Sequence, residues 1–159
     1  MFLIRRMLIA LPLALVCQSV PAFVNSPAKQ TAGASSDVQL RTKVYEESCV
    51  GNLRTLNTAQ VTYWGGDAKK GFARSLKQLG PRGEDLIEQV LATGKKDGYQ
   101  FVLTPGPVDA NGAIRHYTIS ARPSKVLVKG QRSFFTDETG VIRSTPENRA
   151  ATASDPSIQ

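Results

Sequence analysis

One stretch, Val44 to Tyr63, constrains the fold of this chain more than any other. Its apolar and aromatic positions are separated by four, four, three, three and four residues: Tyr45, Cys49, Leu53, Leu56, Ala59 and Tyr63. This spacing puts them on one side of a helix. Gly51 weakens the helix by about 1 kcal/mol relative to alanine. The pattern predicts a helix that packs one apolar face on a sheet. An alternative is that the helix also packs against copies of itself in a filament.

The first 22 residues have the three parts of a secretory signal peptide. Arg5 and Arg6 form a basic start, an apolar run extends from Met7 to Val16, and the segment ends in Val-Pro-Ala. We expect cleavage after Ala22 and export to the periplasm or the medium. The apolar run of ten residues is shorter than the roughly 20 needed to cross a bilayer. An uncleaved membrane anchor and a lipoprotein modified at Cys17 are the alternatives.

The rest of the chain changes from helical to strand-like periodicity. We predict a flexible linker over 23–37, since it is rich in Ser, Ala, Pro, Gly and Gln, and a helix from Val38 to about Tyr63. Two short helices follow, at 75–80 and 84–93, the second with Leu86, Ile87, Val90 and Leu91 on its apolar face. Period-two alternation then indicates strands at 98–104 and 114–122 and a hairpin over 132–143.

This order of elements predicts an α+β fold, in which one long N-terminal helix packs on an antiparallel β-meander. The expected domain covers residues 38–144. Residues 145–159 are polar, contain Pro146 and Pro156, and are predicted to be a disordered tail.

The charge of the chain favours an extracytoplasmic protein over a nucleic-acid-binding one. The net charge is +7, and without residues 1–22 it is +5. The remaining basic residues are scattered and form no dense run with interleaved aromatic residues. We therefore expect no nucleic-acid partner, and contact with a membrane only through an uncleaved leader.

No catalytic set is visible in the sequence, so we expect a protein that is not an enzyme and has no cofactor. His116 is the only histidine and is interpreted as a surface or edge residue, because zinc sites usually need more histidines or cysteines. Cys49 lies on the apolar face of the helix and is expected to be buried. Ser48 has no general base near it in sequence. Glu46 and Glu47 are expected to be in solvent. The aromatic pair Tyr63–Trp64 is expected to pack in the core or, alternatively, to form an exposed patch for a partner.

Asp109-Ala-Asn111-Gly112 is similar to the start of a calcium loop. The ligands of an EF-hand do not follow, because Ile114 and Arg115 come next. An Asx-type turn is the preferred interpretation of this motif.

From Val44 to Ser144 the sequence resembles the type IV pilins and type II secretion pseudopilins. The helix SCVGNLRTLNTAQVTY is similar to the exposed half of the pilin helix, and GYQFVLTPG, HYTISARP and RSFFTDETGVIR are similar to strands of a pseudopilin head domain. The prepilin-peptidase motif and the hydrophobic helix that follows it in that family do not occur here. The resemblance implies a head-domain fold and a place in the cell envelope. Because some major pseudopilins hold calcium near the last strands, it also makes Asp109, Asn111, Asp137 and Glu138 candidate ligands.

Two hypotheses for function follow. The first is an exported, non-enzymatic pilin- or pseudopilin-like protein that acts by contacts with itself or other envelope proteins; the resemblance implies a link to type II secretion or type IV pili. The second is a periplasmic binding module for a small ligand or an envelope polymer, which an enclosed apolar pocket with converging polar groups favours.

Overall fold

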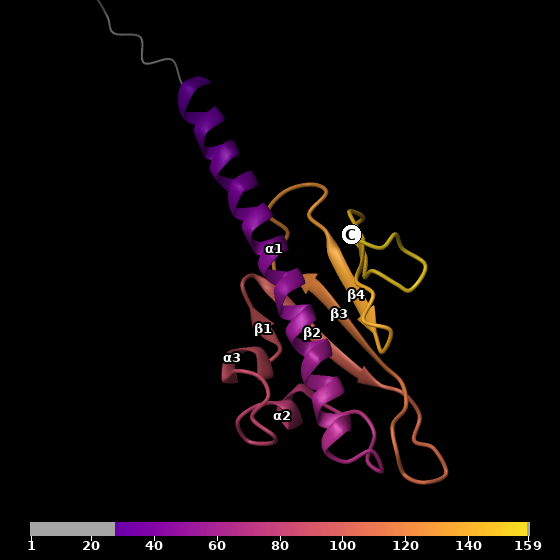
Figure 1. Cartoon of the computed structure of the whole chain (residues 1–159). Helices are drawn as coiled ribbons and strands as arrows, with labels where there is room; N and C mark the ends of the chain where they lie inside the picture. Colours follow the sequence, from indigo (N-terminus) through magenta and orange to yellow (C-terminus); the bar gives the residue numbers. More distant parts are fainter. Residues whose placement is uncertain (1–27, 159) are drawn as a thin grey trace, which may run out of the picture.

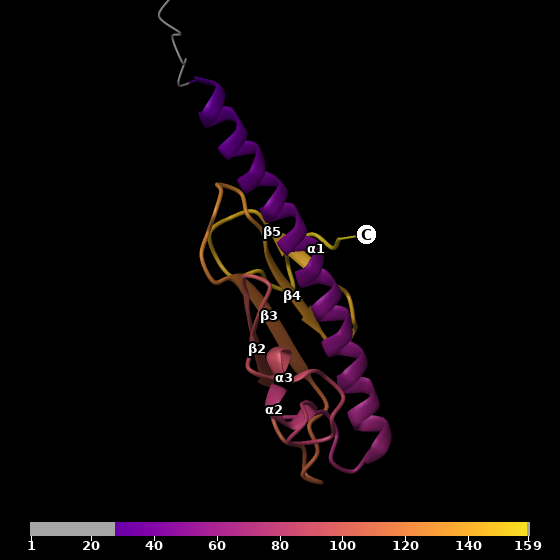
Figure 2. The same ribbon diagram turned by 90° about the vertical axis from the view of Figure 1, so that its left-hand side faces the viewer.

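A single long helix, α1 (Ala28–Gly66), runs along the whole molecule and extends beyond it at one end. The computed structural model describes residues 28–158, with side chains from residue 35 onward. In two perpendicular views the C-terminal part of α1 lies on one side of a sheet, and its N-terminal part projects past the strands (Figures 1 and 2). The predicted signal peptide, 1–22, lies outside the described residues.

The helix begins well before the predicted start at Val38. No proline occurs between Ala28 and Gly66, and most of the polar residues in 28–37 tolerate helical backbone angles, so little prevents the helix from continuing. The prediction of a flexible linker over 23–37 is therefore wrong from residue 28 onward. Composition suggested a linker, but composition alone does not separate a linker from a polar helix.

Five strands form one antiparallel sheet in the order β1-β2-β3-β4-β5. They are β1 (Lys95–Lys96), β2 (Tyr99–Pro105), β3 (Tyr117–Pro123), β4 (Ser133–Asp137) and β5 (Arg143–Thr145). Every neighbouring pair is consecutive in sequence. The predicted α+β class, with a long helix on an antiparallel meander, is confirmed.

The hairpin between β1 and β2 was not predicted, because β1 has only two residues and carries no alternating pattern. Its turn is Asp97-Gly98, with φ angles of +47° and +76°, as a two-residue type I′ turn requires. A Cβ on Gly98 would stand 2.9 Å from the Tyr45 ring. The hairpin therefore packs closely against α1. Glycine is needed at position 98 because the backbone has a positive φ there and because the Tyr45 ring leaves no room for a Cβ.

The connection between α1 and the sheet contains two short helices, α2 (Leu76–Leu79) and α3 (Gln89–Ala92). The predicted helix over 84–93 is wrong in its first half. There, the N–H groups of 84–87 donate to carbonyl groups of residues 78–80, and Asp85 has a φ of +53°. These bonds fold the segment back onto α2 and compete with a regular helix. Val90, predicted on the apolar face, is exposed.

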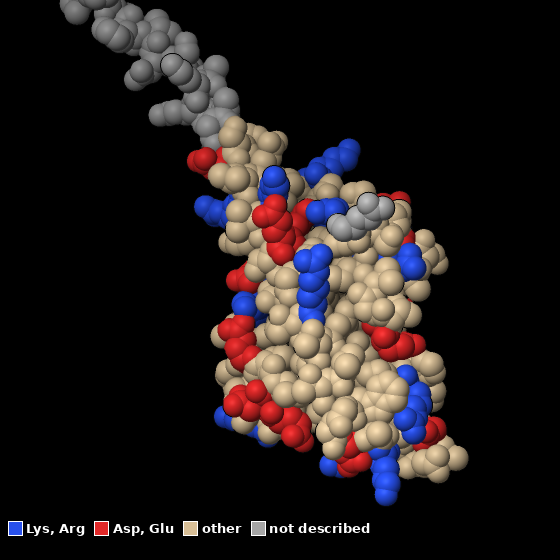
Figure 3. Space-filling view, in the orientation of Figure 1, with Lys and Arg blue, Asp and Glu red and all other residues tan. Residues whose placement is uncertain are grey.

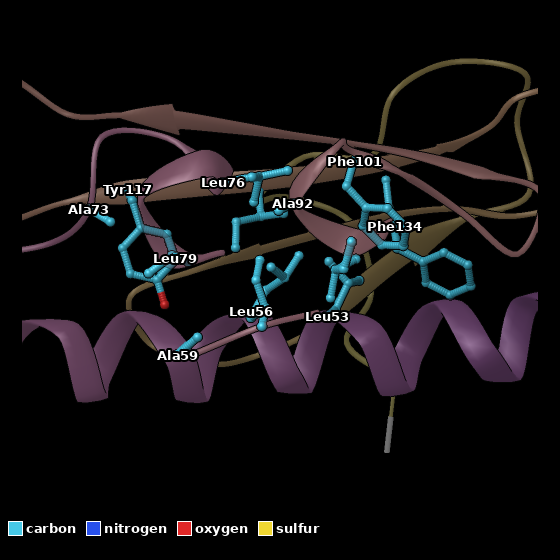
Figure 4. Packing of buried hydrophobic residues seen from close by; sticks show 14 of the residues in the cluster. Leu53, Leu56, Ala59, Ala73, Leu76, Leu79, Ala92, Phe101, Tyr117 and Phe134 are labelled. Carbon is cyan, nitrogen blue, oxygen red and sulfur yellow. The ribbon is translucent and has the colours of Figure 1, made fainter. Parts of the chain in front are cut away.

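The core lies between α1 and the side of the sheet that faces it, called here the inner face. Leu53, Leu56 and Ala59 point from α1 toward the side that carries Phe101, Phe134 and Tyr117, with Leu76, Leu79 and Ala92 packed among them (Figure 4). All of these side chains are buried. Successive strand residues point to opposite sides, so Gln100, Val102, Thr104, Thr118, Ser120 and Phe135 lie on the other side, the outer face.

Residues 146–158 are ordered, so the prediction of a disordered tail over 145–159 is wrong for the described part. Thr145 belongs to β5. The C-terminal segment returns to this strand, where Ser144 N–H donates to the Pro156 carbonyl and Ile158 N–H donates to the Ile142 carbonyl. The Arg149 guanidinium forms two hydrogen bonds with the Asp155 carboxylate, of 2.8 and 2.5 Å. A polar composition suggested disorder, whereas the ion pair between the exposed Arg149 and the buried Asp155, together with backbone bonds to Ile142 and Ser144, holds the segment in place.

Candidate functional site

The side of α1 that faces away from the sheet forms the most distinctive surface of the molecule. Its apolar and small members lie within one arc of the helix and are called the outer stripe: Leu40, Val44, Gly51, Thr55, Thr58, Thr62 and Gly65; the exposed charged residues Asp37 and Glu47 share this arc. All are exposed, and Leu40 and Val44 have 64% and 52% of their surface in solvent. The exposed Val61 flanks the stripe. Uncovered apolar side chains beside small residues are typical of helix surfaces that contact a partner.

Charge is distributed unevenly along α1. Between Cys49 and Gly66, Arg54 is the only charged residue, whereas residues 37–47 include Asp37, Lys43 and Glu47. The space-filling view, in the orientation of Figure 1, shows acidic and basic side chains interspersed around the margin, with one basic side chain near the middle and an uncharged area below it (Figure 3). This run of 18 residues with one charge is visible in the sequence, whereas the periodicity of the apolar residues marks only the buried face.

Two shallow clefts lie beside the outer stripe, between α1 and the segment that contains Leu86. One has a volume of about 310 Å³ and is lined by Arg54, Thr55, Thr58 and neighbours; the other has about 270 Å³ and is lined by Tyr63, Asp67, Glu84 and neighbours. They share Thr62 and Leu86. Together they form an open groove along the helix, which is shaped to receive an elongated element rather than to enclose a small molecule.

Polar bonds fix α1 on the domain near the point where the helix leaves the sheet. The Glu46 carboxylate accepts hydrogen bonds from the backbone N–H and from Nε of Arg132, both of 2.8 Å. Only 12% of the Glu46 side chain is exposed, so the prediction that it is solvated is wrong, while Glu47 is exposed as predicted. The structure brings together residues 86 positions apart, which sequence spacing cannot show.

Ser48 does not meet a general base but forms part of a second polar anchor. Its hydroxyl donates to the Asp97 carboxylate at 2.5 Å, and the Asn52 side chain donates to the same oxygen at 3.2 Å. The hydrogen bond from Ser48 contributes most to lowering the pKa of Asp97 below its ordinary value. A carboxylate whose pKa is lowered is a weak base toward a serine hydroxyl, so we interpret this pair as an anchor that joins the β1–β2 hairpin to α1.

Cys49 is completely buried beneath α1, as predicted. Burial raises the pKa of its thiol far above the ordinary value. A thiol that stays protonated is a poor nucleophile and a poor metal ligand. Cys49 is therefore a small apolar core residue.

Asp109 forms an Asx-type turn, as the preferred interpretation predicted. Its Oδ1 accepts hydrogen bonds from the N–H groups of Asn111 and Ala113, and its Oδ2 accepts one from Nε of Arg115. The backbone bond from Ala113 contributes most to lowering the pKa of this carboxyl group. Arg115 occupies the side on which a cation would bind, so the geometry does not support calcium at Asp109 and Asn111.

His116, Asp137 and Glu138, which are separate in sequence, come together at the ends of β3 and β4. His116 Nδ1 lies 2.6 Å from Glu138 Oε1. Asp137 Oδ1 accepts hydrogen bonds from the N–H and hydroxyl groups of Thr139. Among the described residues, no group of three or more His, Cys, Asp or Glu side chains has the proximity to hold a metal ion. His116 is exposed, as predicted.

Trp64 packs against the core at the C-terminal end of α1. Its ring meets Phe72 edge to face, with centroids 4.8 Å apart, and the Arg115 guanidinium lies 5.9 Å from the ring centroid on another side. Trp64 and Tyr63 are both half-buried. The interpretation of this pair as core packing at the helix end is confirmed, with Tyr63 also lining the groove beside α1.

Comparison with protein families, curated proteins and solved structures finds no match to this chain. In the part of the chain that the structure describes, no helix is both long enough and apolar enough to cross a membrane.

Proposed function

We propose that this protein is an exported, non-enzymatic, pilin- or pseudopilin-like component of the cell envelope of a diderm bacterium, which acts through protein contacts. The observation that carries the proposal is the projection of α1 beyond the sheet together with the exposed apolar and small residues of the outer stripe. A helix that needed only its own sheet would end where the sheet ends. The signal-peptide pattern of residues 1–22 supports export, and the order of helix and meander supports a pilin-like head.

The outer stripe suits contacts between helices. Gly51, Thr55, Thr58 and Thr62 are small, so a neighbouring helix backbone can approach closely, and Leu40 and Val44 add apolar area that is otherwise left in water. The groove beside the stripe widens this surface. A second copy of the chain or another envelope protein of similar helical form is the partner that we expect.

Site-specific cross-linking tests the proposal. Thr58→Cys, made with Cys17→Ser in the full chain, presents one exposed thiol on the outer stripe, because Cys49 is buried and unreactive. A short reagent that joins the thiol to a neighbouring amine (a maleimide coupled to an active ester), added to cells, is expected to give a covalent dimer or a defined heterodimer. Gln100→Cys, on the exposed outer face of the sheet, is the matched control. Equal cross-linking at the two positions, or none at Thr58→Cys, would contradict the proposal.

Export is tested separately by intact mass and fractionation of the native protein. A soluble periplasmic form that begins at Phe23 supports a cleaved signal peptide. A full-length form in the membrane fraction supports an anchor, and a cytoplasmic form contradicts the proposed location.

A further inference from the structure

A second cleft lies on the outer face of the sheet, on the opposite side from α1. Its volume is about 360 Å³. Thr104, Thr118 and Asp137 form one cross-strand row along it, since Thr104 pairs with Thr118 and Thr118 with Asp137. The lining of the cleft also includes Phe135, His116, Glu138 and Ala153. The feature goes beyond the proposed function, because it uses none of the outer stripe of α1.

The alternation of the strands shows that these side chains face the cleft. Thr136 bonds to Asn57 on α1 and is buried, so its neighbours Phe135 and Asp137 point to the outer face. Ile119 is buried on the inner face, which places Thr118 on the outer one. Ala153 reaches the cleft because the Arg149–Asp155 ion pair orders the C-terminal segment.

Several polar groups in the cleft have unused hydrogen-bonding capacity. Within the described residues, the hydroxyl groups of Thr104 and Thr118 have no hydrogen-bond partner. Asp137 accepts its bonds on Oδ1, which leaves Oδ2 available, and His116 uses Nδ1 with Glu138, which leaves Nε2. The cleft thus offers donors and acceptors around the half-buried ring of Phe135.

The kinds of group present select a class of ligand. No lysine or arginine lines the cleft, so it lacks the cations that bind phosphate or carboxylate groups. Two hydroxyl groups and a carboxylate suit a ligand with several O–H groups, and an aromatic ring suits a ligand with an apolar C–H face. A sugar ring carries both. We propose that this outer-face cleft binds a neutral saccharide, such as one unit of an envelope or surface polysaccharide.

Binding by the full chain is measured by ¹H–¹⁵N NMR titration with cellotetraose, maltotetraose and the tetramer of N-acetylglucosamine. Putrescine serves as a cationic probe. At least one saccharide is expected to shift the amide signals of Thr104, Gly106, 116–118 and 135–138, with a Kd of roughly 0.1–1 mM, because an open cleft buries only part of the ligand. Removing one hydrogen bond by Thr118→Val is expected to weaken binding about fivefold.

Three variants separate a specific site from other outcomes. Asp137→Asn keeps the Oδ1 acceptor for Thr139 and is expected to fold, yet it weakens saccharide binding about tenfold through loss of the charged acceptor. Phe135→Ala weakens it by a similar factor through loss of the apolar platform. Thr58→Val on α1 is the matched control and leaves binding unchanged. Absence of saturable shifts with all three saccharides, binding of putrescine alone, or an equal loss in Thr58→Val would overturn the proposal.

Discussion

The contacts of Gln60 allow us to predict how much a substitution at this residue lowers the free energy of unfolding. Its side chain is completely buried between α1 and the segment that follows it. The amide Nε2 donates to the Ala73 carbonyl at 3.2 Å, and the Oε1 accepts from the Ala73 N–H at 2.8 Å. A side chain thus pairs with both polar groups of a buried backbone unit, in the way that a neighbouring strand would.

The change Gln60→Leu removes both bonds with little change in size. Each buried backbone group left without a partner costs about 1–3 kcal/mol, and the gain from burying an apolar side chain returns about 1 kcal/mol. The expected loss of unfolding free energy is therefore about 3 kcal/mol, within a range of about 1–5 kcal/mol. For a chain of this size the melting temperature falls by roughly 10 °C.

Urea denaturation of the full chain, followed by fluorescence of the single tryptophan, measures this change. Trp64 contacts Phe72, one residue before Ala73, so the probe reports on the segment that Gln60 holds. Gln100→Leu, on the exposed outer face, is the control and is expected to change stability by less than about 0.5 kcal/mol. A Gln60→Leu protein as stable as the wild type would refute the view that this amide pair holds the segment on α1.

Two further predictions concern ionised groups. The pKa of Asp97 is lowered, first by its bond from Ser48, so the stabilisation is present above the unfolded value of about 4 and is lost as the pH falls through the folded one. Asp97→Asn is therefore expected to cost about 1 kcal/mol at pH 7, and this cost is expected to shrink as the pH is lowered below about 4 in urea titrations; a cost that does not change with pH would contradict this. In the C-terminal segment, Asp155→Asn weakens the pairing with Arg149, so trypsin is expected to cut after Arg149 at least about tenfold faster, as local opening becomes easier. Cleavage after Lys125, in an exposed loop, should be unchanged, and a uniform acceleration at both sites would point to global unfolding instead.

Local patterns in the sequence predicted the main secondary structure well. The spacing of Cys49, Leu53 and Leu56 marked the buried face of α1, and the alternation around Phe101 and Ile119 marked β2 and β3. These patterns are reliable because burial of one face imposes a period on consecutive residues. The order of the strands also followed, since a meander joins neighbours in sequence.

The predictions from sequence were wrong where they were based on amino-acid composition and not on a periodic pattern. Residues 28–37 were predicted to be a linker and 145–158 a disordered tail because both are polar and poor in large apolar residues. In the first, α1 simply continues in the absence of proline. In the second, Asp155 is held by Arg149 and the backbone joins β5. Neither cause is a local hydrophobic pattern, which is the signal that located the other helices and strands.

The sequence by itself determined that this chain has a helix with one buried face and strands whose residues alternate between a buried and an exposed face. It did so because the period of the apolar residues shows which positions are removed from water. Only the tertiary structure decided which polar groups meet. It joined Glu46 to Arg132, Ser48 to Asp97, and His116 to Glu138, pairs that lie between 22 and 86 positions apart. It also left the outer stripe of α1 and the cleft around Phe135 uncovered. Those surfaces depend on where elements end and on what covers them, and no short stretch of sequence holds that information.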